Sequence, residues 1–161
     1  MFPPPSPLLL LPLLLLILPT PAQSVERQDF LRALRRAGVS VTEQSRCGSD
    51  RYNVALYYYN RNQICISRRL TPSMDSLDQA LTHEAVHAAQ DCLAGQHNGR
   101  MTSLAHSVGE STAPFIDWLQ PGQLSFIQSN YSPDMWDLEI EAYALESRPD
   151  RVAQILSAVC R

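Results

Sequence analysis

Three residues that could together hold and use a metal ion lie within one short stretch of the chain: His83, Glu84 and His87. On a helix, residues four positions apart project from the same face, so both imidazoles can reach one ion. Glu84 follows His83 at about 100° around the helix axis, which leaves its carboxylate beside that ion. This HExxH spacing is typical of a zinc site whose glutamate acts as a general base.

The residues around the motif predict a buried helix. Thr71-Pro72 offers a helix start, and Ser76 with Gln79 offers a capping box. The helix is therefore expected to begin between these two features and to end near Gly95. The face opposite the histidines carries mostly small apolar residues suited to close packing, namely Leu81, Ala85, Ala88, Ala89 and Cys92. The alternative is that two histidines and a glutamate share a solvated helix face by chance.

A catalytic zinc usually takes three protein ligands, so one more is required. Glu139 lies among apolar neighbours in a helix expected over 135–146, where a buried carboxylate needs a partner such as a metal. Glu141, two positions on, would point about 160° away, so only one of the two can serve. The other downstream candidates are His97 and His106, in an expected polar loop, and Glu146.

This order of elements resembles that of the gluzincin metallopeptidases. The resemblance rests on a strand at Ile64-Cys65-Ile66, the HExxH helix and a later helix with Glu139-Ile140-Glu141-Ala142, which matches an ExxA pattern. The small ImmA/IrrE-like branch is the nearest likeness. The resemblance implies that His83, His87 and Glu139 bind Zn²⁺. It also implies that Glu84 is the general base, and that a water on the zinc is the nucleophile that hydrolyses a peptide bond.

The surroundings of the site are less defined by the sequence. Many gluzincins place an acidic or amide residue four positions after the glutamate ligand, where this chain has Tyr143. Asp91, one turn beyond His87, would either support the ligands or be an exposed helix acid. Tyr131, Tyr143 and His106 are alternative donors to a developing oxyanion. The strand at Ile64–Ser67 is the expected edge for an extended substrate.

The pattern of apolar residues predicts an α+β fold of the minimal zincin-like kind. An N-terminal helix is expected over Val25–Ala37, followed by a small antiparallel sheet formed by residues 39–42, 52–59 and 63–67. The HExxH helix and several C-terminal helices complete the domain. The helices nearest the C-terminus are expected over 135–146 and 151–160.

The first 22 residues are typical of a secretory signal peptide. Leu8 to Leu18 is almost unbroken leucine, and Thr20 and Ala22 fit the small residues before a cleavage site. The apolar run is about eleven residues, short of the ~20 that a membrane-spanning helix needs. We therefore expect a mature domain over residues 23–161 that is secreted or periplasmic, with no stable membrane span after cleavage.

The four cysteines form an even set, which in an exported chain favours two disulfides. Three connectivities are possible. We favour Cys47 with Cys65, across the expected sheet, and Cys92 with Cys160, which would join the end of the HExxH helix to the C-terminal helix.

The chain has a formal net charge of −3 and no basic run, which argues against nucleic acid as a partner. The expected partner is a peptide or protein substrate, and the sequence leaves the oligomeric state open. Two competing hypotheses remain at this point: a non-catalytic zinc-binding domain for protein interaction, and a disulfide-bonded structural domain with an accidental HExxH.

Overall fold

The computed structural model describes residues 21–49, 53–70, 73–96 and 98–160. These residues form a mixed α+β fold, which confirms the predicted class. The helices are α1 (Pro21–Arg36), α2 (Met74–Leu93), α3 (Ala113–Ile116), α4 (Gln123–Asn130), α5 (Trp136–Leu145) and α6 (Pro149–Val159). The strands are β1 (Ser40–Gln44), β2 (Ala55–Tyr58) and β3 (Gln63–Ser67).

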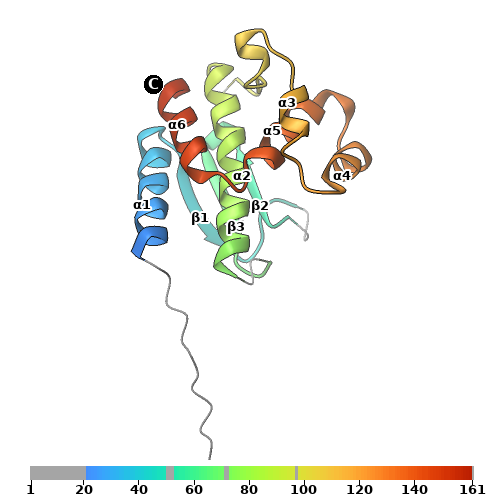
Figure 1. Ribbon diagram of the computed structural model, residues 1–161. Coiled ribbons are helices and arrows are strands. Elements are labelled where there is room, and N and C mark those ends of the chain that lie inside the picture. Colours follow the sequence, from blue (N-terminus) through green and yellow to red (C-terminus); the bar gives the residue numbers. More distant parts are fainter. Residues whose placement is uncertain (1–20, 50–52, 71–72, 97, 161) are drawn as a thin grey trace, which may run out of the picture.

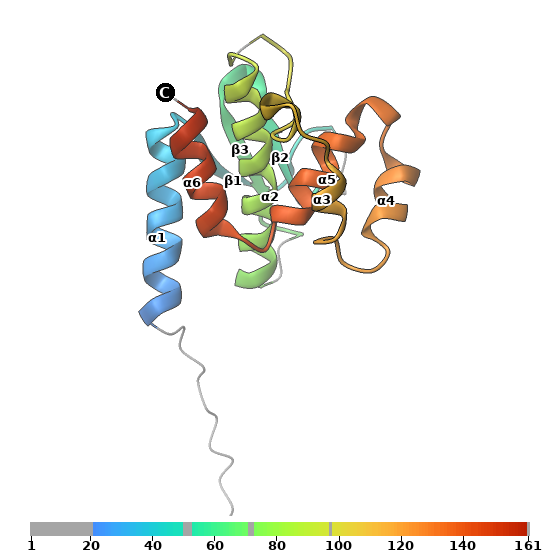
Figure 2. The same ribbon diagram turned by 45° about the horizontal axis from the view of Figure 1, so that its top comes forward.

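Helix α2, which carries the HExxH motif, runs through the middle of the molecule. Figures 1 and 2 show α1 and α6 on one side of it, and α3, α4 and α5 on the other. The helix packs against α5, α6, β2 and β3, and its residues 81–91 are almost all buried. A central helix of this kind holds its side chains rigidly, as a metal site requires.

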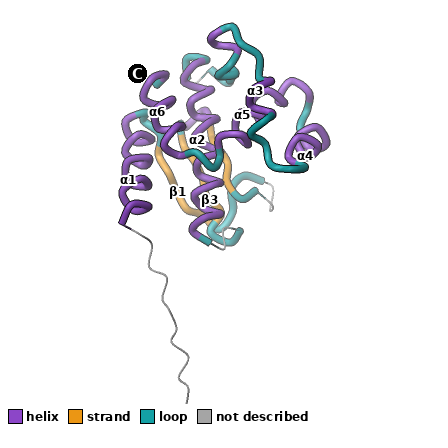
Figure 3. The backbone as a smooth tube through the Cα atoms, viewed as in Figure 1, coloured by secondary structure: helices purple, strands orange, loops and turns teal. Residues whose placement is uncertain are grey.

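The sheet has the strand order β1-β3-β2 and is mixed, which corrects the prediction of an antiparallel sheet. Figure 3 shows its strands in orange. Strand β2 pairs antiparallel with β3, but β1 pairs parallel with it. The burial of the strands explains this order, because four of the five residues of β3 are buried whereas β1 is mostly exposed. Strand β3 lies in the centre, with β1 on one side of it and β2 on the other.

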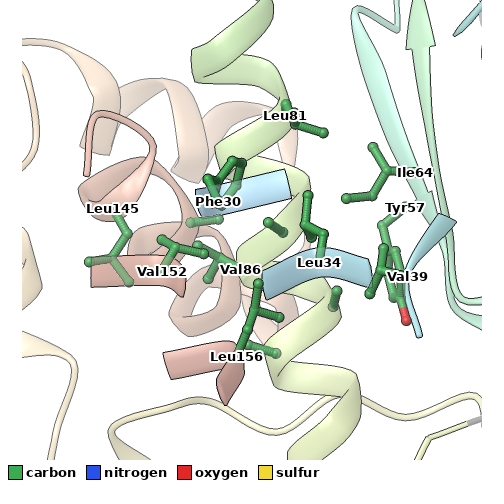
Figure 4. Close-up of a cluster of buried hydrophobic side chains, with 14 of the residues drawn as sticks. Phe30, Leu34, Val39, Tyr57, Ile64, Leu81, Val86, Leu145, Val152 and Leu156 are labelled. Carbon is green, nitrogen blue, oxygen red and sulfur yellow. The ribbon is translucent and has the colours of Figure 1, made fainter. Parts of the chain in front are cut away.

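The hydrophobic core lies between α1, α2, α6 and the sheet, as Figure 4 shows. Leu34 of α1, Ile64 of β3 and Leu156 of α6 are fully buried there. Ala85, Ala88 and Ala89 of α2 are also fully buried, so the small-residue face of this helix packs closely as predicted. Each large apolar side chain that leaves water in such a core contributes about 1.5–3 kcal/mol.

Both predicted disulfides are present. Cys47 is bonded to Cys65 and Cys92 to Cys160, with Cα–Cα distances of 5.7 and 5.1 Å. The second bond fixes the C-terminal end of α2 to the residue that follows α6. Because disulfides persist where thiols are not kept reduced, these bonds indicate an oxidising or extracellular environment.

The predicted signal peptide falls almost entirely on residues 1–20, which lie outside the described part of the chain. In the described part, α1 begins at Pro21, earlier than the helix start that the sequence indicated. None of the described helices is both long and apolar enough to cross a membrane.

Candidate metal centre

The two histidines project from α2 near its middle, more than one turn from either end. The helix begins after Ser73, whose side-chain oxygen accepts a hydrogen bond from the amide of Ser76 at 3.2 Å. Ser73 is therefore the N-cap, and the helix begins between Thr71-Pro72 and Ser76, as the sequence indicated. Both imidazoles are largely shielded from solvent, with exposed side-chain fractions of 12% for His83 and 9% for His87.

Helix α5 brings Glu139 against both histidines. The Nε2 atom of His83 lies 3.4 Å from Glu139 Oε2, and the Nε2 atom of His87 lies 3.5 Å from Glu139 Oε1. A tetrahedral zinc site with bonds of about 2.1 Å has neighbouring ligand atoms about 3.4 Å apart. Each of the two observed distances is close to this edge length, and the two contacts use different oxygens of Glu139.

Glu139 also has unused capacity to bind a cation. It is 4% exposed, and its Oε2 atom is fully buried without a hydrogen-bond partner. A buried carboxylate oxygen in this state is costly unless a proton or a metal compensates its charge. One ligand atom from each of His83, His87 and Glu139 lies within 4.8 Å of the others, so this group could hold a metal ion.

Each histidine has a second polar partner at its Nδ1 atom. Glu146 Oε2 lies 3.4 Å from His83 Nδ1, and the carboxylate is itself held by a 2.9 Å hydrogen bond from Gln123 Nε2. Gln90 Oε1 lies 2.8 Å from His87 Nδ1. Contacts of this kind orient an imidazole so that Nε2 faces the metal. One histidine thus has a carboxylate partner and the other an amide.

These outer partners differ from the sequence expectation. Tyr143, at the position where many gluzincins have an acidic or amide residue, packs edge-on against His83 with ring centroids 4.6 Å apart. Glu146, three residues further on at the C-cap of α5, makes the polar contact instead. Gln90 was not identified from the sequence, although its position three residues after His87 on a buried helix is a usable signal.

Asp91 takes neither of the two roles that we considered. It is fully buried, and its Oδ2 atom accepts a 2.7 Å hydrogen bond from the hydroxyl of Tyr57 on β2. The same hydroxyl lies 2.9 Å from Asn62 Oδ1. Asp91 therefore belongs to a contact between α2 and the sheet, because its side chain is directed at β2 and away from the ligands.

Glu141, the alternative ligand, points away from the histidines as its position on the helix predicts. It is fully buried, and its carboxylate accepts hydrogen bonds from Ser103 Oγ and from the amides of Leu104 and Ala105, at 2.6–2.9 Å. A fourth bond comes from Gln90 Nε2 at 2.9 Å. With all its capacity used in these contacts, Glu141 is not in the group that could hold a metal.

Glu84 lies beside the ligands and is held by the sheet. Its Oε2 atom accepts a 2.7 Å hydrogen bond from the backbone amide of Tyr57, and the residue is 8% exposed. Glu84 and His83 both line an open pocket of about 400 Å³. The carboxylate is therefore held at the wall of this pocket, next to His83.

The same pocket has an aromatic wall. Phe126 and Tyr131, from α4 and its C-cap, and Tyr143 of α5 line it, with ring centroids 6.0–6.4 Å from Phe126 to each tyrosine. His106 does not line the pocket; it is about half exposed and lies 3.5 Å from Asp137. Of the three oxyanion candidates, the structure brings only the two tyrosines to the site. His97 lies outside the described residues.

Burial and nearby charges change the ionisation of the site. Burial acts to lower the pKa of His83, but Glu139 and Glu146 outweigh this effect and raise the pKa to about 10. Burial acts in the opposite direction on Glu139, yet the neighbouring His83 and His87 keep its pKa below the ordinary value. Without a metal, His83 is therefore the cation that balances Glu139.

This shift predicts how pH changes the stability of the metal-free protein. The pKa of His83 is raised from 6.5 to about 10. Its contribution to stability is therefore complete below about pH 6.5 and is lost as the pH rises through 10. Thermal unfolding of the chelator-treated protein should show a melting temperature that falls across this interval. His83→Gln should remove that dependence, and an equal fall in both proteins would contradict the assignment.

One family model matches residues 17–161, and its description is Domain of unknown function (DUF8637). No curated protein and no solved structure matches the chain.

Proposed function

We propose a function from the site itself, because the chain belongs to the DUF8637 family, whose description assigns none. The protein is an exported zinc-dependent metallopeptidase that hydrolyses peptide bonds. The observation that carries this proposal is the position of Glu84 beside the group formed by His83, His87 and Glu139, at the wall of an open pocket.

Zinc is the metal that this donor set fits best. Two imidazole nitrogens and one carboxylate oxygen form the three-ligand set found in catalytic zinc sites. A bound zinc ion would lower the pKa of a coordinated water and polarise a substrate carbonyl. Glu146 and Gln90 would keep His83 and His87 oriented with Nε2 towards it.

Glu84 would act as the general base and then as the general acid. Its Oε2 atom is held by the amide of Tyr57, which leaves Oε1 as the oxygen available to take a proton from the attacking water. The same carboxyl group then delivers the proton to the departing amine. The two proton transfers balance, because Glu84 returns to its ionised form when the peptide bond is broken.

The substrate would lie along β2 and not along β3. The earlier expectation of an edge at Ile64–Ser67 is wrong, because β3 is the central strand of the sheet. The amide of Ser67 bonds to the carbonyl of Val54, so in this antiparallel pair the backbone groups of Ala55 point outward. Ala55 also lines the pocket, so an extended peptide could add to this edge with its scissile bond near Glu84.

Tyr131 is the donor to a developing oxyanion that we propose. Burial, and next the charge of Glu139, raise the pKa of its hydroxyl well above the ordinary tyrosine value. The phenol therefore keeps its proton and can donate it in a hydrogen bond. Tyr143 has a raised pKa for the same leading reason and lies on the same wall, where it would support Tyr131.

The direct test of this function is removal and return of the metal. Purified protein with its disulfides intact is incubated with an unfolded labelled protein and with a library of fluorogenic peptides. We expect cleavage that a chelator abolishes and that one equivalent of zinc restores. Zinc binding without any cleavage across the library would instead support the non-catalytic zinc-binding domain.

A further inference from the structure

We infer that Glu141 is a positioning residue that sets, through Gln90, which nitrogen of His87 faces the metal group. The inference rests on the metal site and not on peptide hydrolysis. It links helix α5, the loop at residues 103–105 and the ligand on α2 in one chain of hydrogen bonds.

The first step is that Glu141 acts only as an acceptor. The backbone amides of Leu104 and Ala105 donate to its two oxygens at 2.8 and 2.9 Å, and the hydroxyl of Ser103 lies 2.6 Å from Oε1. A backbone N–H has no acceptor role, so both carboxylate oxygens must present lone pairs. The group of Gln90 that faces Oε2 must therefore be a donor.

The second step fixes the side-chain amide of Gln90. Its Nε2 atom lies 2.9 Å from Glu141 Oε2 and 3.0 Å from the carbonyl oxygen of Leu138. Because both neighbours are acceptors, the amide cannot be rotated by half a turn without placing its oxygen against two other oxygens. Gln90 is fully buried, so no solvent could compensate for such a rotation.

The third step passes the orientation to His87. With Nε2 committed to Glu141 and Leu138, Gln90 Oε1 faces His87 Nδ1 at 2.8 Å. An amide oxygen only accepts, so Nδ1 of the imidazole carries the hydrogen. In the neutral ring this leaves the lone pair on Nε2, the atom 3.5 Å from Glu139 Oε1. Glu141 thus acts on the metal site although it does not belong to the ligand group.

The test is ¹⁵N NMR of the His87 ring in the zinc-loaded protein, with metal affinity measured in parallel by chelator competition. In the wild type we expect the Nδ1–H form to predominate. Glu141→Gln and Gln90→Leu should both shift the ring towards the Nε2–H form and weaken zinc binding by about 10–100-fold. Thr112→Val is the matched control, since it removes a partly buried hydrogen bond to Asp137 of α5 without touching this chain of contacts.

The control should lower stability while leaving the His87 tautomer and the zinc affinity unchanged. A wild-type ring that carries its proton mainly on Nε2 would overturn the inference without any variant. It would also be overturned if Glu141→Gln kept the wild-type tautomer. If Glu141→Gln does not fold, the same result in Gln90→Leu would overturn it. Loss of peptide cleavage alone would not decide the matter, because the readouts here are the spectrum and the affinity.

Discussion

Replacement of Glu84 by glutamine is expected to reduce peptide hydrolysis by about 10²–10⁴-fold, the usual contribution of a general base. The amide is nearly the same size as the carboxylate and can still accept the hydrogen bond from Tyr57, so the fold should be unchanged. Zinc content should also be unchanged, because Glu84 is not part of the ligand group. The measurements are kcat on a peptide that the wild type cleaves and metal content of the same sample.

Glu110→Gln provides the control, since Glu110 is an exposed glutamate away from the pocket and its replacement removes the same charge. It should keep wild-type activity. Full activity in Glu84→Gln would remove Glu84 from the proposed role, and a loss of zinc in that variant would mean that the glutamate serves the metal directly.

The second large effect is expected from the ligands themselves. His83→Ala and Glu139→Gln should each weaken zinc binding by more than the roughly 10–100-fold that loss of an outer partner costs. Glu139→Gln retains the side-chain volume but removes the charge that His83 and His87 face across 3.4 and 3.5 Å. Chelator competition on the folded proteins measures both effects.

His106→Ala is the matched control for the histidine variant, because His106 is half exposed and contacts Asp137 outside the ligand group. It should bind zinc like the wild type. If Glu139→Gln kept full zinc affinity, the third ligand would have to come from elsewhere, and Glu146, which lies 3.4 Å from His83 Nδ1, would be the next residue to replace.

Sequence reasoning succeeded where the determining interactions are local. The spacing of His83 and His87 specifies one helix face, and the separation between Glu139 and Glu141 decides that only one of them meets that face. Both points agree with the structure. The preferred cysteine pairing was also confirmed, because it joined segments that the expected elements placed side by side.

The features that the sequence did not reveal depend on contacts between distant segments. Strand β1 pairs parallel with β3 because β3, the most deeply buried strand, lies in the centre of the sheet. A local pattern of apolar residues does not give this strand order. An aspartate at the position of Asp91 in a helix is usually exposed. Here Asp91 faces Tyr57, because β2 packs against that side of α2. Glu146 becomes a partner of His83 only when α5 docks, and the same docking brings Leu138 and Glu141 against Gln90.

The metal content of the purified domain tests the central claim most directly. Protein prepared with both disulfides formed and without added chelator is measured for zinc and other metals by elemental analysis. We predict about one equivalent of zinc per chain in the wild type, and less than a tenth of that after exhaustive dialysis of His87→Ala. A fully folded wild type that contains no metal and takes up none at micromolar zinc would contradict the account.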